Sequence, residues 1–153
     1  MWPVVAGSLA GCCWPYETRP LTEPESRVVD RLCGMIADHA RRSEHPDDLA
    51  VSQAIEAARR EGRILAFEDD RRPRGDRKHG AVVMGRLYLH ESLLDGGDSL
   101  RGRRCPYPLM MLYHEGVHLT QSTCLLIFSP GAAEHRAERE SYRFAKEWER
   151  GGR

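Results

Sequence analysis

The chain has 153 residues, a length that suits one domain with room for a substantial core. Its 23 basic and 23 acidic residues cancel, so no global electric field favours nucleic acid or an anionic membrane surface as a partner. Hydrophobic residues make up 41% of the chain and charged residues 30%, the balance of an ordinary globular domain. No stretch approaches the about 20 apolar residues of a membrane-spanning helix, so no span is predicted.

The first 21 residues predict an extended leader, which precedes a single domain over residues 22–150. The segment Leu9-Ala10-Gly11-Cys12 resembles a bacterial lipoprotein processing box, so lipid attachment at Cys12 is one alternative. Neither lysine nor arginine precedes the apolar run, and the run is short for a signal peptide. A disordered or strand-like leader is therefore the preferred interpretation.

Two amphipathic helices are expected at the start of the domain. Thr22 or Glu23 can cap the first helix, because a proline follows at once and fits a first helical turn. Apolar residues then recur at helical spacing until about residue 42. After a break at "SEHPDD", a second helix is expected over about 47–61, and Gly62 marks its end.

A small sheet follows the two helices. "RILAFE" (63–68) is strand-like, and "AVVMGRLYLH" (81–90) predicts a strand or a hairpin that turns at Gly85-Arg86. Polar loops separate these segments from each other and from the next helix. Two further helices, over 109–121 and about 132–149, complete an order of elements that is typical of the α+β class.

The segment "LMMLYHEGVHLTQ" (109–121) places His114 and His118 one helical turn apart. Side chains at positions i and i+4 share one face of a helix, so both imidazoles can face the same point in space. A zinc ion takes nitrogen ligands at about 2.0–2.1 Å in a tetrahedral array, and this pair can supply two of the four. Glu115 is rotated by about 100° from His114, where it flanks such an ion and can take a proton from a zinc-bound water.

The rarity of this motif and its surroundings both favour a metal site. An H-E-x-x-H pattern is expected roughly 0.03 times in a random chain of this length and composition. The neighbouring residues are mostly apolar, and buried imidazoles and carboxylates are costly unless they bind something. The alternative is a helix whose histidines only form hydrogen bonds with their neighbours.

The last helix can supply a third zinc ligand. Glu134 lies close to the centre of its apolar stripe and Glu138 lies on the flank, so periodicity alone does not choose between them. His135 is a further alternative. The arginines of this helix, including Arg143, are expected to point outward.

The motif "YHEGVHLTQ", followed about 20 residues later by "EHRAERESYRF", resembles zincin metallopeptidases of the gluzincin type. Those enzymes have an H-E-x-x-H helix and a downstream helix that bears a glutamate ligand. The sequence looks most similar to small bacterial peptidase domains, some of which occur in toxin and secretion systems. The resemblance covers roughly residues 81–149 and implies a small zincin-like domain.

The resemblance also implies roles for individual residues. Tyr142 can donate a hydrogen bond to a developing oxyanion or to a metal ligand, or pack half-buried without a catalytic role. A serine stands three residues after the expected glutamate ligand, where the pattern usually has alanine. The zinc ligands implied are His114, His118 and Glu138, with Glu115 as the general base.

Three neighbouring features have supporting roles in this hypothesis. Gly116 costs about 1 kcal/mol inside a helix and suggests that another backbone segment packs closely there. Gln121, one turn past His118, can orient that imidazole. The resemblance to zincins also implies that the strand "GRLYLHE" (85–91) lies at the edge of the sheet, where it can pair with an extended substrate.

The sequence therefore predicts a zinc-dependent metallopeptidase that acts on a peptide or protein substrate. It predicts Zn²⁺ as the cofactor and no nucleic-acid partner. The alternative is a non-catalytic zinc-binding or protein-interaction domain that retains the two helices. The five cysteines contain no C-x-x-C pair and favour a reducing compartment. We therefore expect a cytoplasmic protein or, following the resemblance, an effector that is secreted.

Overall fold

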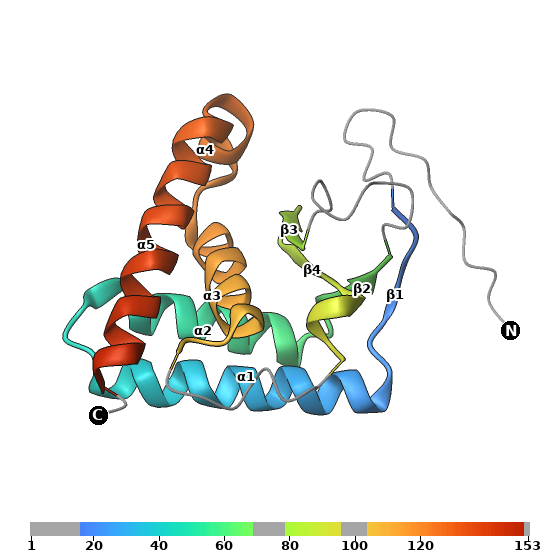
Figure 1. The fold of residues 1–153 in the computed structure, drawn as a ribbon. Coiled ribbons are helices and arrows are strands. Elements are labelled where there is room, and N and C mark those ends of the chain that lie inside the picture. Colours follow the sequence, from blue (N-terminus) through green and yellow to red (C-terminus); the bar gives the residue numbers. More distant parts are fainter. Residues whose placement is uncertain (1–15, 69–78, 96–103, 152–153) are drawn as a thin grey trace, which may run out of the picture.

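The computed structural model describes residues 16–68, 79–95 and 104–151. These residues form an α+β domain, as the sequence predicted. Figure 1 shows helix α3 between α5 and the sheet, with α1 and α2 packed beneath it. The helices are α1 (Glu23–Arg42), α2 (Pro46–Arg60), α3 (Tyr107–Thr120), α4 (Thr123–Phe128) and α5 (Pro130–Gly151), and the strands are β1 (Thr18–Pro20), β2 (Ile64–Phe67), β3 (Gly80–Val83) and β4 (Arg86–His90).

The first helix begins where the sequence predicted. The backbone N–H of Thr22 donates to the carboxylate of Glu25 at 2.7 Å, and the Thr22 carbonyl accepts from the Ser26 backbone. The first contact gives the Thr22 N–H a partner that the helix backbone does not supply, and the second is the first backbone hydrogen bond of the helix. The apolar face of α1 then packs on α2 and α3. No described helix is both long enough and apolar enough to cross a membrane.

The leader contributes to the sheet. Thr18–Pro20, which the sequence assigned to the extended leader, forms β1 and pairs antiparallel with β2. The folded unit therefore includes residues before position 22. Cys12, the alternative site of lipid attachment, lies outside the described residues.

The segment over 81–90 forms a hairpin, one of the two expected alternatives. Met84 and Gly85 occupy the turn, with φ values of 51° and 73°, the combination found in tight two-residue hairpin turns. The prediction that residues 85–91 form the edge of the sheet is wrong, because β4 (Arg86–His90) lies between β2 and β3. Four of its five residues are buried, whereas β3 is half-buried throughout. A strand that is buried on both faces belongs inside a sheet, so β3 takes the edge.

Helix α3 contacts every other layer of the domain. It packs on α1, α2 and α5 and on strands β3 and β4. A Cβ atom added at Gly116 would lie 2.5 Å from Ile55 Cδ1 and 2.9 Å from Val51 Cγ1. The mid-helix glycine therefore lets α2 approach α3 closely, as the sequence suggested.

A buried ionic network joins four helices. Asp48 of α2 has an exposed fraction of 0%. Its Oδ1 accepts hydrogen bonds from Tyr113 Oη of α3 and from Arg143 Nη2 of α5, both at 2.5 Å. His39 Nε2 of α1 lies 3.2 Å from the other carboxylate oxygen. The prediction that Arg143 points outward is wrong. Its guanidinium contacts Asp48, because a buried carboxylate needs a charged partner.

We predict opposite effects for alanine at two helical glycines. Gly116→Ala should lower the free energy of unfolding by about 1–3 kcal/mol, because the added methyl group overpacks a core with no room for it. Gly34→Ala should raise it by about 0.5–1 kcal/mol, because open space surrounds that position and alanine is the better helix former. Urea unfolding of both variants measures the difference, and equal effects would contradict the close contact between α2 and α3.

We also predict that Asp48 makes the free energy of unfolding fall at acidic pH. Burial alone raises the pKa of Asp48, but the contacts of its carboxylate with His39 and Arg143 outweigh this effect and hold the pKa well below the usual range. Its contribution to stability is therefore complete above the unfolded-state pKa of about 4 and is lost as the pH falls below that value.

Asp48→Asn should cost about 1.5–3 kcal/mol at neutral pH, because Arg143 loses its hydrogen bond to a buried carboxylate while it keeps Glu140 and Glu147 as charge partners. Tyr113→Phe removes two hydrogen bonds, the one that Tyr113 Oη donates to Asp48 and the one that it accepts from Arg143 at 2.9 Å, and should cost about 1–3 kcal/mol. Denaturant titrations at pH 7 and pH 3.5 test both statements. An Asp48→Asn variant with the same acid sensitivity as the wild type would contradict this role.

Candidate metal centre

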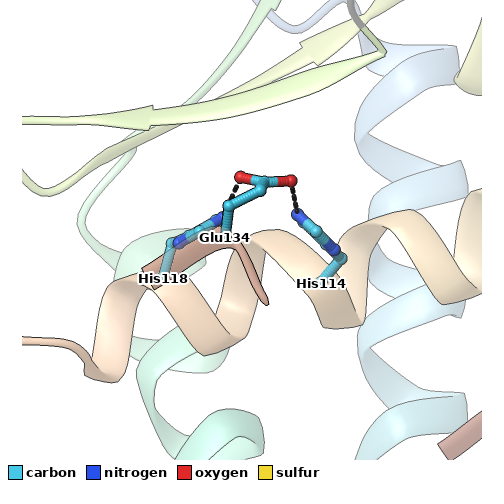
Figure 2. A group of neighbouring side chains, drawn as sticks. All are labelled: His114, His118 and Glu134. Atoms are coloured by element: carbon cyan, nitrogen blue, oxygen red, sulfur yellow. Dashed lines mark ion pairs between the residues drawn. The ribbon is translucent and has the colours of Figure 1, made fainter. Parts of the chain in front are cut away.

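The two histidines of α3 and one glutamate of α5 converge on a common point. The imidazole centroids of His114 and His118 are 5.0 Å apart, and both side chains are buried. Glu134 Oε1 lies 3.2 Å from His114 Nε2, and Glu134 Oε2 lies 3.3 Å from His118 Nε2. Figure 2 shows this carboxylate above the two rings, with one oxygen toward each. The sequence predicted the shared face of the two histidines.

The distances within this group suit a shared cation. Two ligands at about 2.0–2.1 Å from a tetrahedral zinc ion are separated by about 3.3–3.4 Å. A direct hydrogen bond between a protonated imidazole and a carboxylate would be shorter, at about 2.7–2.9 Å. The observed separations are therefore close to an edge of a zinc tetrahedron, and these three residues could hold such an ion.

Glu134, rather than Glu138, joins the histidines in the structure. The resemblance implied Glu138, whereas periodicity left both glutamates open. The turn at Ser129 brings the chain back beside the end of α3, so the beginning of α5 meets the histidines. Glu138 lies one turn further along α5, where it lines the same pocket, and its charge still acts on His114. His135 is exposed and belongs to no group of metal-ligating side chains among the described residues.

The surroundings favour a neutral imidazole at His114. Burial lowers the pKa of His114 below its usual value, although the negative charge of Glu134 opposes this shift. A neutral imidazole has the free lone pair that a metal ion requires. Glu134 supplies negative charge from a side chain that is 55% exposed.

Glu115 is held beside this group by a close contact with the sheet. Its side chain is 3% exposed. A Cβ atom at Gly80 of β3 would lie 2.7 Å from Glu115 Oε1. Gly80 therefore makes the space that the carboxylate occupies, and β3 fixes the position of the candidate general base relative to the histidines.

Gln121 contacts both segments of the site. Its Oε1 lies 2.9 Å from His118 Nδ1, and its Nε2 donates to the Ala133 carbonyl at 2.9 Å. The sequence proposed that Gln121 orients the imidazole, and the structure shows the contact. The second hydrogen bond, to α5, has no local signal in the sequence, because it depends on the return of the chain after α4.

A pocket of about 660 Å³ opens beside these residues. Its walls come from the edge strand β3, the exposed side of α3 and the first turns of α5. Tyr142 lines it and is 62% exposed. His79 also lines it, next to Gly80, and burial lowers the pKa of this imidazole. Sequence reasoning missed His79 because it follows a polar loop and belongs to no motif.

Two other groups of described residues also bring a histidine and two carboxylates together. In the group of His39, Asp48 and Glu147, the guanidinium of Arg143 already contacts both carboxylates. The group of His45, Asp47 and Glu140 likewise has arginines on both of its carboxylates. An arginine thus supplies the positive charge in each of these two groups, whereas among the described residues no arginine forms an ion pair with Glu134.

The site therefore joins a compact group of His114, His118 and Glu134 to a pocket that Glu115 also lines. Two imidazole nitrogens and one carboxylate face a common point, and a second carboxylate, that of Glu115, lines the open pocket that adjoins them. A comparison of the chain with protein-family models, with curated protein sequences and with solved structures finds no match. The inference of function consequently rests on the geometry of this site.

Proposed function

We propose that the chain is a zinc-dependent metallopeptidase of the zincin type, in which His114, His118 and Glu134 bind the zinc ion. The observation that supports this most directly is the pair of distances, 3.2 and 3.3 Å, from the Glu134 oxygens to the two imidazoles. A bound zinc ion would polarise the scissile carbonyl and lower the pKa of water to about 7. Three protein ligands leave a fourth position open, as hydrolytic zinc sites require.

Glu115 is the general base in this proposal. Its carboxylate flanks the two histidines and lies at the wall of the pocket. It would take a proton from the attacking water and pass it to the amine that leaves when the peptide bond breaks. The contact with Gly80 holds the carboxylate in place, so little reorganisation is needed before the proton is transferred.

The edge strand β3 is the proposed binding site for the substrate backbone. One side of β3 pairs with β4, and its residues Gly80, Ala81 and Val82 line the pocket. An extended peptide can add to such an edge through backbone hydrogen bonds. This strand replaces 85–91, which the sequence had suggested for the same role. Peptide binding here would bring the scissile bond toward Glu115.

Tyr142 and Glu138 complete the proposed pocket. Both lie on α5 and line the pocket beyond the metal ligands. The phenol of Tyr142 can donate to the oxyanion that develops during attack on the carbonyl. Glu138 is proposed to contact substrate through solvent-exposed carboxylate oxygens, while Glu134 takes the place among the zinc ligands that the resemblance gave to Glu138.

The metal ligands can be tested one by one. We expect stoichiometric zinc in the wild-type protein after dialysis, and loss of that zinc in His114→Ala and Glu134→Gln. Glu138→Gln is the matched control, because it makes the same chemical change one turn away and should retain zinc. Inductively coupled plasma mass spectrometry measures the zinc content of each variant. Equal zinc in the wild type and His114→Ala would disprove the site, and loss in Glu138→Gln alone would return the ligand role to Glu138.

Glu115→Gln separates catalysis from metal binding. It should retain zinc and lower peptide hydrolysis by about 10²–10⁴-fold, the usual contribution of a general base. Cleavage of a peptide library, followed by mass spectrometry, measures the rate. Zinc binding without cleavage by the wild-type protein would support the alternative of a non-catalytic zinc-binding domain.

Gly80→Ala should impair catalysis without removing the metal. The added methyl group displaces the Glu115 carboxylate, and a shift of about 1 Å at a catalytic group can cost about 10²-fold in rate. Zinc content should remain unchanged. Gly131→Ala is the control, since no atom outside its local helix lies within 4 Å of the added group. The same peptide-library assay applies, and full activity in Gly80→Ala would contradict the positioning of Glu115 by β3.

A further inference from the structure

We infer that Gln121 is a positioning residue that leaves the Nε2 lone pair of His118 free for a cation and ties this imidazole to the segment carrying Glu134. The inference rests on the metal site proposed above, but its two contacts, with His118 Nδ1 and with the Ala133 carbonyl, do not involve the proposed ligand atoms. Gln121 follows the last residue of α3, and its backbone N–H donates to the His118 carbonyl at 3.2 Å. Its side chain is buried between the end of α3 and the start of α5.

The amide of Gln121 has one end that accepts and one end that donates. A backbone carbonyl can only accept a hydrogen bond, so the contact with Ala133 O must be made by the amide nitrogen. The amide oxygen therefore faces His118 Nδ1, at 2.9 Å. Because this oxygen can only accept, the proton of a neutral His118 belongs on Nδ1.

This assignment determines the state of the other ring nitrogen. With the proton on Nδ1, the lone pair of His118 Nε2 points toward Glu134 Oε2, 3.3 Å away. A histidine side chain that is free in water prefers the opposite arrangement, with the proton on Nε2. Gln121 thus favours, against the attraction of the Glu134 carboxylate for a proton on Nε2, the form of the imidazole that can bind a metal ion without first moving a proton.

The same amide links the two segments that carry the ligands. Ala133 directly precedes Glu134, so the hydrogen bond to its carbonyl limits how far the glutamate backbone can move from His118. The chain between them runs through α4, whose six residues include no buried side chain. Gln121 therefore provides a direct and buried connection between the ends of α3 and α5, where the covalent connection is held only weakly by packing.

Two substitutions separate the two contacts. Gln121→Met keeps a side chain of similar length but removes both hydrogen bonds. Gln121→Glu keeps an acceptor for the His118 Nδ1 proton but places a carboxylate oxygen against the Ala133 carbonyl, where no donor remains. Thr120→Val is the matched control, because the Thr120 hydroxyl only donates to the Val117 carbonyl within α3. Circular dichroism establishes that each variant is folded.

The first measurement needs no zinc. Nitrogen-15 NMR of the histidine rings in metal-free protein, at a pH of about 9, reports which nitrogen carries the proton, since histidine has an ordinary pKa of about 6.5. We expect the proton on Nδ1 of His118 in the wild type, in Thr120→Val and in Gln121→Glu, and on Nε2 in Gln121→Met. A wild-type ring with its proton on Nε2, or a Gln121→Met ring identical to wild type, would overturn the inference.

The second measurement is zinc affinity, by competition with a chromophoric chelator. Gln121→Met should bind zinc about 10–100-fold more weakly, the usual cost of losing a residue that orients a metal ligand. Gln121→Glu should show a smaller loss, because it keeps the contact with the ring, and Thr120→Val should bind as the wild type does. Unchanged affinity in Gln121→Met would overturn the inference. A wild-type protein without affinity for zinc would instead contradict the metal site, and the NMR result would still decide the role of Gln121.

Discussion

The buried carboxylate of Asp48 is the interaction on which the arrangement of the helices depends. It lies on α2 and contacts Tyr113 of α3 and Arg143 of α5, with His39 of α1 nearby. Tyr113 immediately precedes His114, and Arg143 is on the same helix as Glu134. The contact between Asp48 and these two residues therefore sets the relative positions of α3 and α5. Because the proposed metal ligands are divided between those two helices, their spacing follows from the same constraint.

Helix α3 serves the core and the site with different faces. Tyr113 and Gly116 face the packed helices, where Tyr113 stacks on Phe144 at a centroid distance of 4.2 Å and Gly116 admits α2. His114, Glu115 and His118 line the pocket. A helix fixed on several sides by packing loses little further entropy when its polar side chains bind a ligand. This rigidity accounts for the placement of the site on α3 rather than on a loop.

Much of the fold followed from local patterns in the sequence. The capping residues at the start of α1, the hairpin between β3 and β4 and the shared face of the two histidines all depend on neighbours a few residues away. The order of strands in the sheet does not depend on such local neighbours. The sequence placed 85–91 at the edge, whereas the greater burial of β4 puts it inside and leaves β3 exposed to the pocket.

The parts of the candidate site that sequence reasoning left open concern contacts between helices. Periodicity showed that Glu134 and Glu138 share a side of α5, but the choice depends on how α5 crosses α3, which no local pattern encodes. Arg143 was expected outside because arginine is usually exposed, and only the buried partner on α2 explains its position. The contact from Gln121 to α5 depends on the same crossing.

The three grouped side chains differ sharply in how much of each is enclosed by the protein. Both imidazoles are part of the interior, whereas the carboxylate of Glu134 remains 55% exposed at the rim. A substitution of Glu134 at the rim disturbs few packed atoms, so aspartate, histidine or cysteine there would cost little folding stability. Since donor type governs which divalent ions a site prefers, a substitution at this single position would change the metal preference of the proposed site while the helical framework stays intact.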